Sequence, residues 1–128
     1  MTVSGGTFHV GTFGRGTLNQ TGGAVTGHVW MIVARYPGST GTYSLSGGTL
    51  AQMGADFGLV VGERGLGVLT VSGTGVADLV GGLALSGGLG PWSTEGTGIV
   101  NLCTGGTIDT PIVRKYLGAN ATFNFDGG

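Results

Sequence analysis

The amino-acid sequence predicts an all-β protein folded as a parallel β-helix, or β-solenoid, of about five turns of roughly 25 residues with three short strands per turn. Three observations predict this fold. Glycine is abundant in a chain that is also hydrophobic. A unit made of a strand, a glycine corner and a second strand recurs along the chain, and apolar and polar residues alternate with period two around each corner. The chain has 31 glycines, yet 40% of its residues are hydrophobic and only 9% are charged. Disordered chains lack that hydrophobic content, so we interpret the glycines as corner residues of an ordered domain.

The first repeated phrase joins two short strands through a glycine corner. It reads TYSLSGGTLAQ at residues 42–52, and related stretches begin at residues 1, 17, 68, 100 and 121. The first glycines of these corners, used as anchors, are Gly5, Gly22, Gly47, Gly73, Gly105 and Gly127. The residue three positions after each of the first five anchors is apolar: Phe8, Val25, Leu50, Val76 and Ile108. We expect this column to face the core.

Residues before each anchor alternate between apolar and small polar types, which is typical of a strand with one buried face. In TYSLSGG, Tyr43 and Leu45 are predicted to point inward and Ser44 and Ser46 outward. The copy at residue 100 fits only with one extra residue, a β-bulge at Cys103 or Thr104. With that bulge, Val100 and Leu102 turn inward and Asn101 joins the polar column.

A second phrase fills the space between corners, as VGTFGRGTL at residues 10–18 and VGERGLGVL at residues 61–69. Each copy reads as an apolar strand end followed by a glycine-rich turn. Successive anchors lie about 25 residues apart, which is the length of one solenoid turn. The shortest interval, from Gly5 to Gly22, predicts that the first coil is abbreviated or that its missing strand lies outside the chain. The longest, from Gly73 to Gly105, predicts a loop insertion at residues 86–96.

Stacked turns place equivalent residues about 4.8 Å apart, so each column must hold side chains that tolerate their own kind. The outward columns form a flat, nearly uncharged surface rich in hydroxyl groups. We expect this surface, together with one loop tryptophan, to contact neighbours. Its residues are Thr17, Asn19, Thr21, Thr42, Ser44, Ser46, Thr70, Ser72 and Trp92.

Charge and composition exclude several classes of function. The formal net charge is −1 with five Lys and Arg residues, so no basic surface for nucleic acid is expected. No apolar run approaches the ~20 residues that span a bilayer, so no membrane insertion is expected. The acidic residues are scattered over different turns, and His9 and His28 lack metal-ligand spacing. The single cysteine, Cys103, rules out an internal disulfide. We therefore expect no catalytic site, cofactor or metal.

The repeats GTLNQTGGAV at residues 16–25, GTYSLSGGTL at 41–50 and GIVNLCTGGTI at 98–108 resemble the glycine-rich repeats of bacterial surface proteins, such as autotransporter passenger regions. The resemblance covers essentially the whole chain. It implies a right-handed parallel β-helix, an extracellular or cell-surface location in a bacterium, and a structural or adhesive role. It does not specify an activity, because enzymes and passive stalks share this scaffold.

A solenoid whose first and last turns carry no cap exposes unpaired strand edges. We expect residues 1–128 to be a single solenoid domain that forms one segment or stacking unit of a longer fibre. Stacking one copy head-to-tail on the next gives an open homopolymer. The sequence therefore predicts a non-enzymatic structural protein of an extracellular filament or stalk. The alternatives are an adhesin or polysaccharide-binding module, an ice-binding protein and a carbohydrate-active enzyme.

Overall fold

Short apolar strands and long glycine-containing strands alternate along the chain. The computed structural model describes residues 1–56, 58–87, 95–116 and 120–128, which form an all-β solenoid of about four turns. Every pairing between named strands is parallel. The short strands are β2 (Phe8–Val10), β4 (Met31–Val33), β6 (Leu59–Val61), β8 (Leu83–Leu85) and β11 (Val113–Lys115). The others are β1 (Thr2–Val3), β3 (Arg15–Gly27), β5 (Thr40–Gln52), β7 (Leu66–Leu79), β9 (Thr97–Cys103), β10 (Thr107–Asp109) and β12 (Asn120–Asp126).

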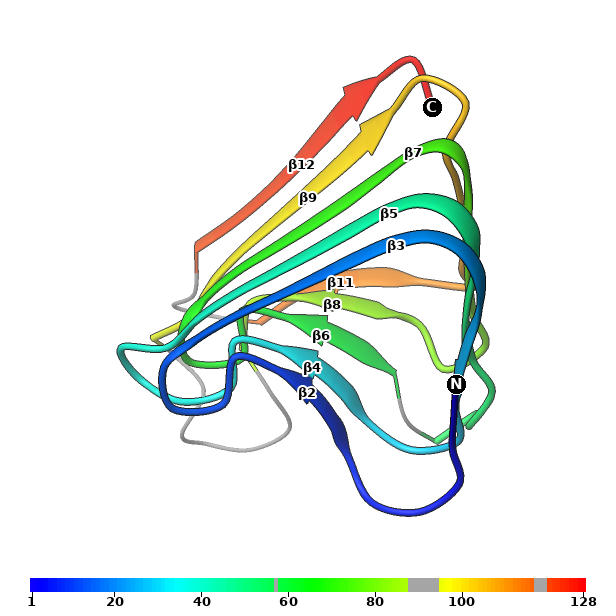
Figure 1. Cartoon of the computed structure of the whole chain (residues 1–128). Helices are drawn as coiled ribbons and strands as arrows, with labels where there is room; N and C mark the ends of the chain where they lie inside the picture. The colour runs from blue at the N-terminus through cyan, green and yellow to red at the C-terminus, as the bar shows by residue number, and fades with distance from the viewer. Residues whose placement is uncertain (57, 88–94, 117–119) are drawn as a thin grey trace.

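The strands build three walls around one core (Figure 1). The short strands form one five-stranded sheet in the order β11-β8-β6-β4-β2, the short-strand wall. The other strands form a seven-stranded sheet that bends at the glycine corners. Its segments before the corner, including β9 and β12, make the long-strand wall. Its segments after the corner, with β1 and β10, make the return wall.

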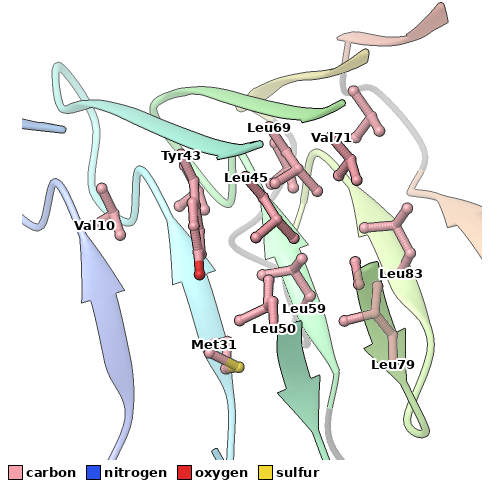
Figure 2. Packing of buried hydrophobic residues seen from close by; sticks show 14 of the residues in the cluster. Val10, Met31, Tyr43, Leu45, Leu50, Leu59, Leu69, Val71, Leu79 and Leu83 are labelled. Atoms are coloured by element: carbon pink, nitrogen blue, oxygen red, sulfur yellow. The ribbon is translucent and has the colours of Figure 1, made fainter. Parts of the chain in front are cut away.

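Parallel pairing aligns equivalent residues into columns. On the long-strand wall one inward column is Leu18, Tyr43, Leu69, Val100 and Phe123, and the next is Gln20, Leu45, Val71, Leu102 and Phe125. Figure 2 shows the members Tyr43, Leu45, Leu69 and Val71 of these columns. They share one cluster with side chains of the short strands, including Met31, Leu59 and Leu83. Tyr43, Leu45, Met31 and Leu59 are at most 1% exposed. Burial of each such side chain stabilises the fold by about 1.5–3 kcal/mol.

The inner short strands are buried on both sides. All residues of β4, β6 and β8 are buried, which explains why they read as continuous apolar runs rather than alternating ones. Their outward residues, Ile32, Val60 and Ala84, form a second cluster against which Trp30 and Tyr116 pack. The solenoid therefore carries a second, smaller apolar layer outside the short-strand wall.

The corner after each of the first four short strands turns through a residue in the left-handed conformation. These residues are Gly11, Ala34, Gly62 and Ser86, with φ of 77°, 63°, 76° and 53°. Their amides extend the ladder across the corner, as in the Gly62 N–H donating to the Val33 carbonyl at 2.7 Å. The next strand passes so close to this corner that a Cβ at Gly41 would overlap the Val10 carbonyl oxygen. Glycine at such positions lets the two walls meet at a sharp edge.

A single buried amide side chain ties together the loops at the corner that leads into the short-strand wall. Gln52 is fully buried. Its Nε2 donates to the Gly54 carbonyl at 3.0 Å, and its Oε1 accepts from the Gly81 amide at 2.9 Å. Buried polar groups are costly unless they are hydrogen-bonded, and these bonds both satisfy Gln52 and link two successive turns. The equivalent positions in the neighbouring turns are Gly27 and Leu79.

The fold class is confirmed, but the turns differ from the prediction in number and composition. There are about four turns because five stacked strands on a wall are separated by four steps. The turns β3–β4, β5–β6 and β7–β8 each have one short strand and one long, bent strand, whereas the turn β9–β10–β11 has three short strands as predicted. The long strands bend at the corner, where Gly23, Gly48 and Gly73 adopt positive φ, and their parallel pairing resumes after register shifts at that corner.

The alignment of the first repeated phrase was wrong for its copy that begins at residue 1. Thr2 pairs with Thr26 and Phe8 pairs with Met31, so Gly5 lies at the corner between the return and short-strand walls. Phe8 therefore does not join the column of Val25, and the first coil is not abbreviated. The error arose because this corner, Ser4-Gly5-Gly6, has a hydroxyl residue followed by two glycines, as does the corner at Thr21-Gly22-Gly23.

The extra residue predicted near Cys103 is already present one turn earlier. The pairing between β5 and β7 shifts by one residue at Leu45–Gly47, which brings Ala77 rather than Val76 into the inward column. Val100 and Leu102 are buried as predicted. The predicted insertion at residues 86–96 connects β8 to β9, and its residues 88–94 lie outside the described residues.

Replacing Gly62 by alanine tests the left-handed corner. The new Cβ would overlap the Thr97 carbonyl oxygen in a backbone conformation that costs about 1–2 kcal/mol for any other residue. We expect Gly62→Ala to lower the free energy of unfolding in urea by more than about 2 kcal/mol. Gly14→Ala is the matched control, since its Cβ would meet nothing within 4 Å. Equal stabilities of the two variants would contradict this account of the corner.

Candidate contact surfaces

The predicted hydroxyl-rich surface forms on the outside of the long-strand wall. One outward column contains Asn19, Ser44, Thr70, Asn101 and Asn124. Asn124 Nδ2 donates to Asn101 Oδ1 at 2.8 Å, and Asn101 Nδ2 donates to Thr70 Oγ1 at 3.3 Å. Polar side chains thus form a hydrogen-bonded ladder parallel to the solenoid axis.

The second outward column is less uniform than the first. Thr17 and Thr42 are followed by Val68 and Ile99 before Thr122 completes the column. The hydroxyl-rich surface is therefore interrupted by two half-buried aliphatic side chains. The remaining predicted contact residues, Thr21, Ser46 and Ser72, lie near the glycine corner where the sheet bends. Trp92 lies outside the described residues.

The inward columns are exposed at the C-terminal end of the described solenoid and half-buried or buried at the N-terminal end. At the C-terminal end Phe125 is 70% exposed, Val113 49% and Phe123 39%. A hollow of about 250 Å³ opens there between the walls, lined by Leu85, Val113, Lys115 and Phe123 among others.

At the N-terminal end a hollow of about 300 Å³ is lined by residues that include Phe8, Val10, Leu18 and Gly16. Interior side chains at both ends lack the covering turn that inner side chains have.

A charged cluster forms at the edge between the short-strand and long-strand walls. Arg35 Nη1 lies 2.9 Å from His9 Nε2, and Arg35 Nε lies 3.6 Å from Glu63 Oε2. Arg64 Nη2 lies 3.8 Å from Glu95 Oε2. These residues come from four successive turns, so the stacking of the loops brings opposite charges together.

Burial and neighbouring charge shift two ionisable groups of this cluster. Burial raises the pKa of the Glu63 carboxyl, an effect that Arg35 and Arg64 oppose. Burial and the Arg35 guanidinium lower the pKa of His9. The imidazole is therefore neutral at pH 7, with Nε2 accepting from Arg35 and Nδ1 placed 3.3 Å from Thr12 Oγ1.

Two aromatic rings stack beside this cluster. The rings of Phe13 and Tyr36 are 4.4 Å apart and nearly parallel, and Arg35 lies 5.2 Å from the centre of the Tyr36 ring. Phe13 is 78% exposed. The ring spacing is close to the strand spacing, so the pair continues the ladder of the solenoid in its loops.

Within the described ranges, no three His, Cys, Asp or Glu residues lie close enough together to hold a metal ion. Cys103 is a half-buried free thiol at the end of β9. Over the same part of the chain, no helix has the length and apolar character needed to cross a membrane.

The charged cluster was missed because its members are far apart in sequence. An alignment of the loops on the left-handed residues Gly11, Ala34 and Gly62 would have placed Thr12, Arg35 and Glu63 in one column. The structure stacks these loops in the same way, since the Arg35 N–H donates to the Gly11 carbonyl and the Glu63 N–H donates to the Ala34 carbonyl. No family model, curated protein or solved structure matches this chain. The functional conclusion therefore depends on the surfaces themselves.

Replacing His9 tests the charged cluster by its pH dependence. Because the pKa of His9 is below 6.5 in the folded state, the unfolded chain binds this proton more tightly. Wild-type stability is expected to be fully present above pH 6.5 and to fall as the pH drops below it. His9→Gln should reduce that loss in urea unfolding between pH 7.5 and 5.5. The exposed substitution Asn19→Gln should retain the wild-type slope, and a wild-type slope in His9→Gln would contradict the assignment.

Proposed function

We propose that this chain is a non-enzymatic structural repeat protein that builds an extracellular filament or cell-surface stalk by end-to-end stacking of its solenoid. The observation that carries the proposal is the exposure of interior columns at the C-terminal end, together with a hollow at each end of the solenoid. Phe123 and Phe125 occupy columns whose inner members Leu69, Val71 and Val100 are fully buried. Covering a side chain of this size stabilises an assembly by about 1.5–3 kcal/mol.

Backbone pairing supports the same proposal. The two sheets end in β1 and β2 at one end of the solenoid and in β12 and β11 at the other. An added parallel strand would satisfy the amides and carbonyls at such an edge, as every inner strand already does for its neighbours. The two ends differ in sequence, so their contact is heterologous and propagates as a filament.

The extracellular and bacterial assignments in this proposal derive from the resemblance to glycine-rich repeats of bacterial surface proteins. A regular stalk is consistent with the low charge of the chain and with the even ladder of small polar residues on the long-strand wall. The partner required is another solenoid turn, supplied by a second copy of this chain. Nothing in the proposal calls for a cofactor, a nucleic acid or insertion into a membrane.

Replacing Phe125 by aspartate tests the assembly. Wild-type protein is expected to form filaments visible by negative-stain microscopy and to sediment as large particles. Phe125→Asp places a charge in the end column and should raise the concentration needed for assembly at least about tenfold. Leu66→Asp is the matched control because Leu66 is 41% exposed on an inner turn. A wild-type chain that stays monomeric at high concentration would overturn the proposal.

A second candidate function, polysaccharide binding by an adhesin module, is favoured by the exposed Phe13 ring. Its stacking on Tyr36 makes a rigid aromatic platform of the kind that packs against sugar rings. If this function holds, Phe13→Ala should reduce retention on immobilised polysaccharide, whereas Leu66→Ala should not. Equal retention of both variants would contradict polysaccharide binding at Phe13 and leave the structural role as the only proposed function.

A further inference from the structure

The two hollow ends of the solenoid match each other in register. We propose that a second copy of this chain seats its first turn on the last turn of the first copy in one register, with Leu18 of the second copy over Phe123, Asn19 over Asn124 and Gln20 over Phe125. This inference rests on the proposed end-to-end assembly and specifies its interface.

The register follows from the pairing within the chain. Leu18, Asn19 and Gln20 begin the columns that end in Phe123, Asn124 and Phe125. The same step on the short-strand wall puts Phe8 over Val113 and Val10 over Lys115. Each wall carries five stacked strands, so the first strand of a second copy becomes a sixth step on every wall at once.

The two hollows close against each other in this register. Phe8, Val10 and Leu18 line the hollow at the N-terminal end. Their proposed partners Val113, Lys115 and Phe123 line the hollow at the C-terminal end. The contact therefore covers the exposed Val113 and Phe123 with the half-buried Phe8 and Leu18 in one step.

The polar ladder outside the wall selects the same register. Asn124 already donates to Asn101, while its side-chain oxygen accepts no hydrogen bond from the described residues. Asn19 of a second copy, one strand away, brings an amide donor beside that oxygen, and Thr17 comes beside Thr122. A shift by one residue would turn the Asn side chains into the core, and a shift by two would place Asn19 beside Thr122.

One contact in this register is unfavourable. Lys115 stands in the inward column of Val33, Val61 and Leu85, so stacking places its ammonium group against Val10 of the second copy. An inward-pointing charge on an end strand opposes strand-edge association. Lys115 therefore weakens the contact that the phenylalanines favour, and sets the concentration at which assembly begins.

Paired cysteines test the register, in a Cys103→Ser background. Thr17→Cys with Thr122→Cys, and Asn19→Cys with Asn124→Cys, place the two cysteines of adjacent copies about 4.8 Å apart, within disulfide reach. The control pairs Thr17→Cys with Asn124→Cys, and Asn19→Cys with Thr122→Cys, use the same four positions at about 8 Å, beyond that reach. Mild oxidation of filaments should give covalent ladders on non-reducing gels for the first two pairs only.

The outcomes separate this inference from the proposed function. Filaments in which the control pairs cross-link as well as the matched pairs would overturn the register and leave the filament proposal standing. Absence of any assembly would overturn both. As a second readout, Lys115→Val should lower the concentration for assembly about tenfold while Lys115→Arg leaves it near the wild-type value. A higher assembly concentration for Lys115→Val would contradict the placement of Lys115 against Val10.

Discussion

The parallel backbone ladder between successive turns is the constraint on which the rest of this structure depends. It fixes equivalent residues about 4.8 Å apart, so each position of the repeat becomes a column whose members touch their own counterparts. Apolar columns fill the core, as with Leu45 and Val71, and amide and hydroxyl columns hydrogen-bond outside, as with Asn101 and Asn124. The same ladder leaves an unfinished column at each end, which connects the fold to its proposed assembly.

The sharp edges of the solenoid come from backbone geometry rather than from side chains. Left-handed residues end each of the first four short strands, and two of them, Ala34 and Ser86, are not glycine. The surrounding turns hold these residues in a conformation that an isolated chain would avoid. Local strain is thus offset by stacking on the neighbouring turns.

The sequence predicted the fold class and the inward columns because period-two alternation around a glycine corner repeats along the chain. It misplaced the copy at residue 1 because the corners before Phe8 and after Gln20 both have a hydroxyl residue followed by two glycines, and only the strand pairing distinguishes them. It missed the cluster of His9, Arg35 and Glu63 because those residues meet only after the loops stack. The end surfaces were inferable as unpaired edges, but the hollows and the inward Lys115 required the walls to be in place.

The distance between spin labels on Thr17 and Thr122, measured by pulsed electron paramagnetic resonance in dilute protein, tests the stacked-column account most directly. Four strand-to-strand steps separate these residues along one column, so the account predicts a backbone separation of about 19 Å with a narrow distribution. A separation well above 30 Å, or a broad distribution, would contradict the parallel in-register stack and the assembly built on it.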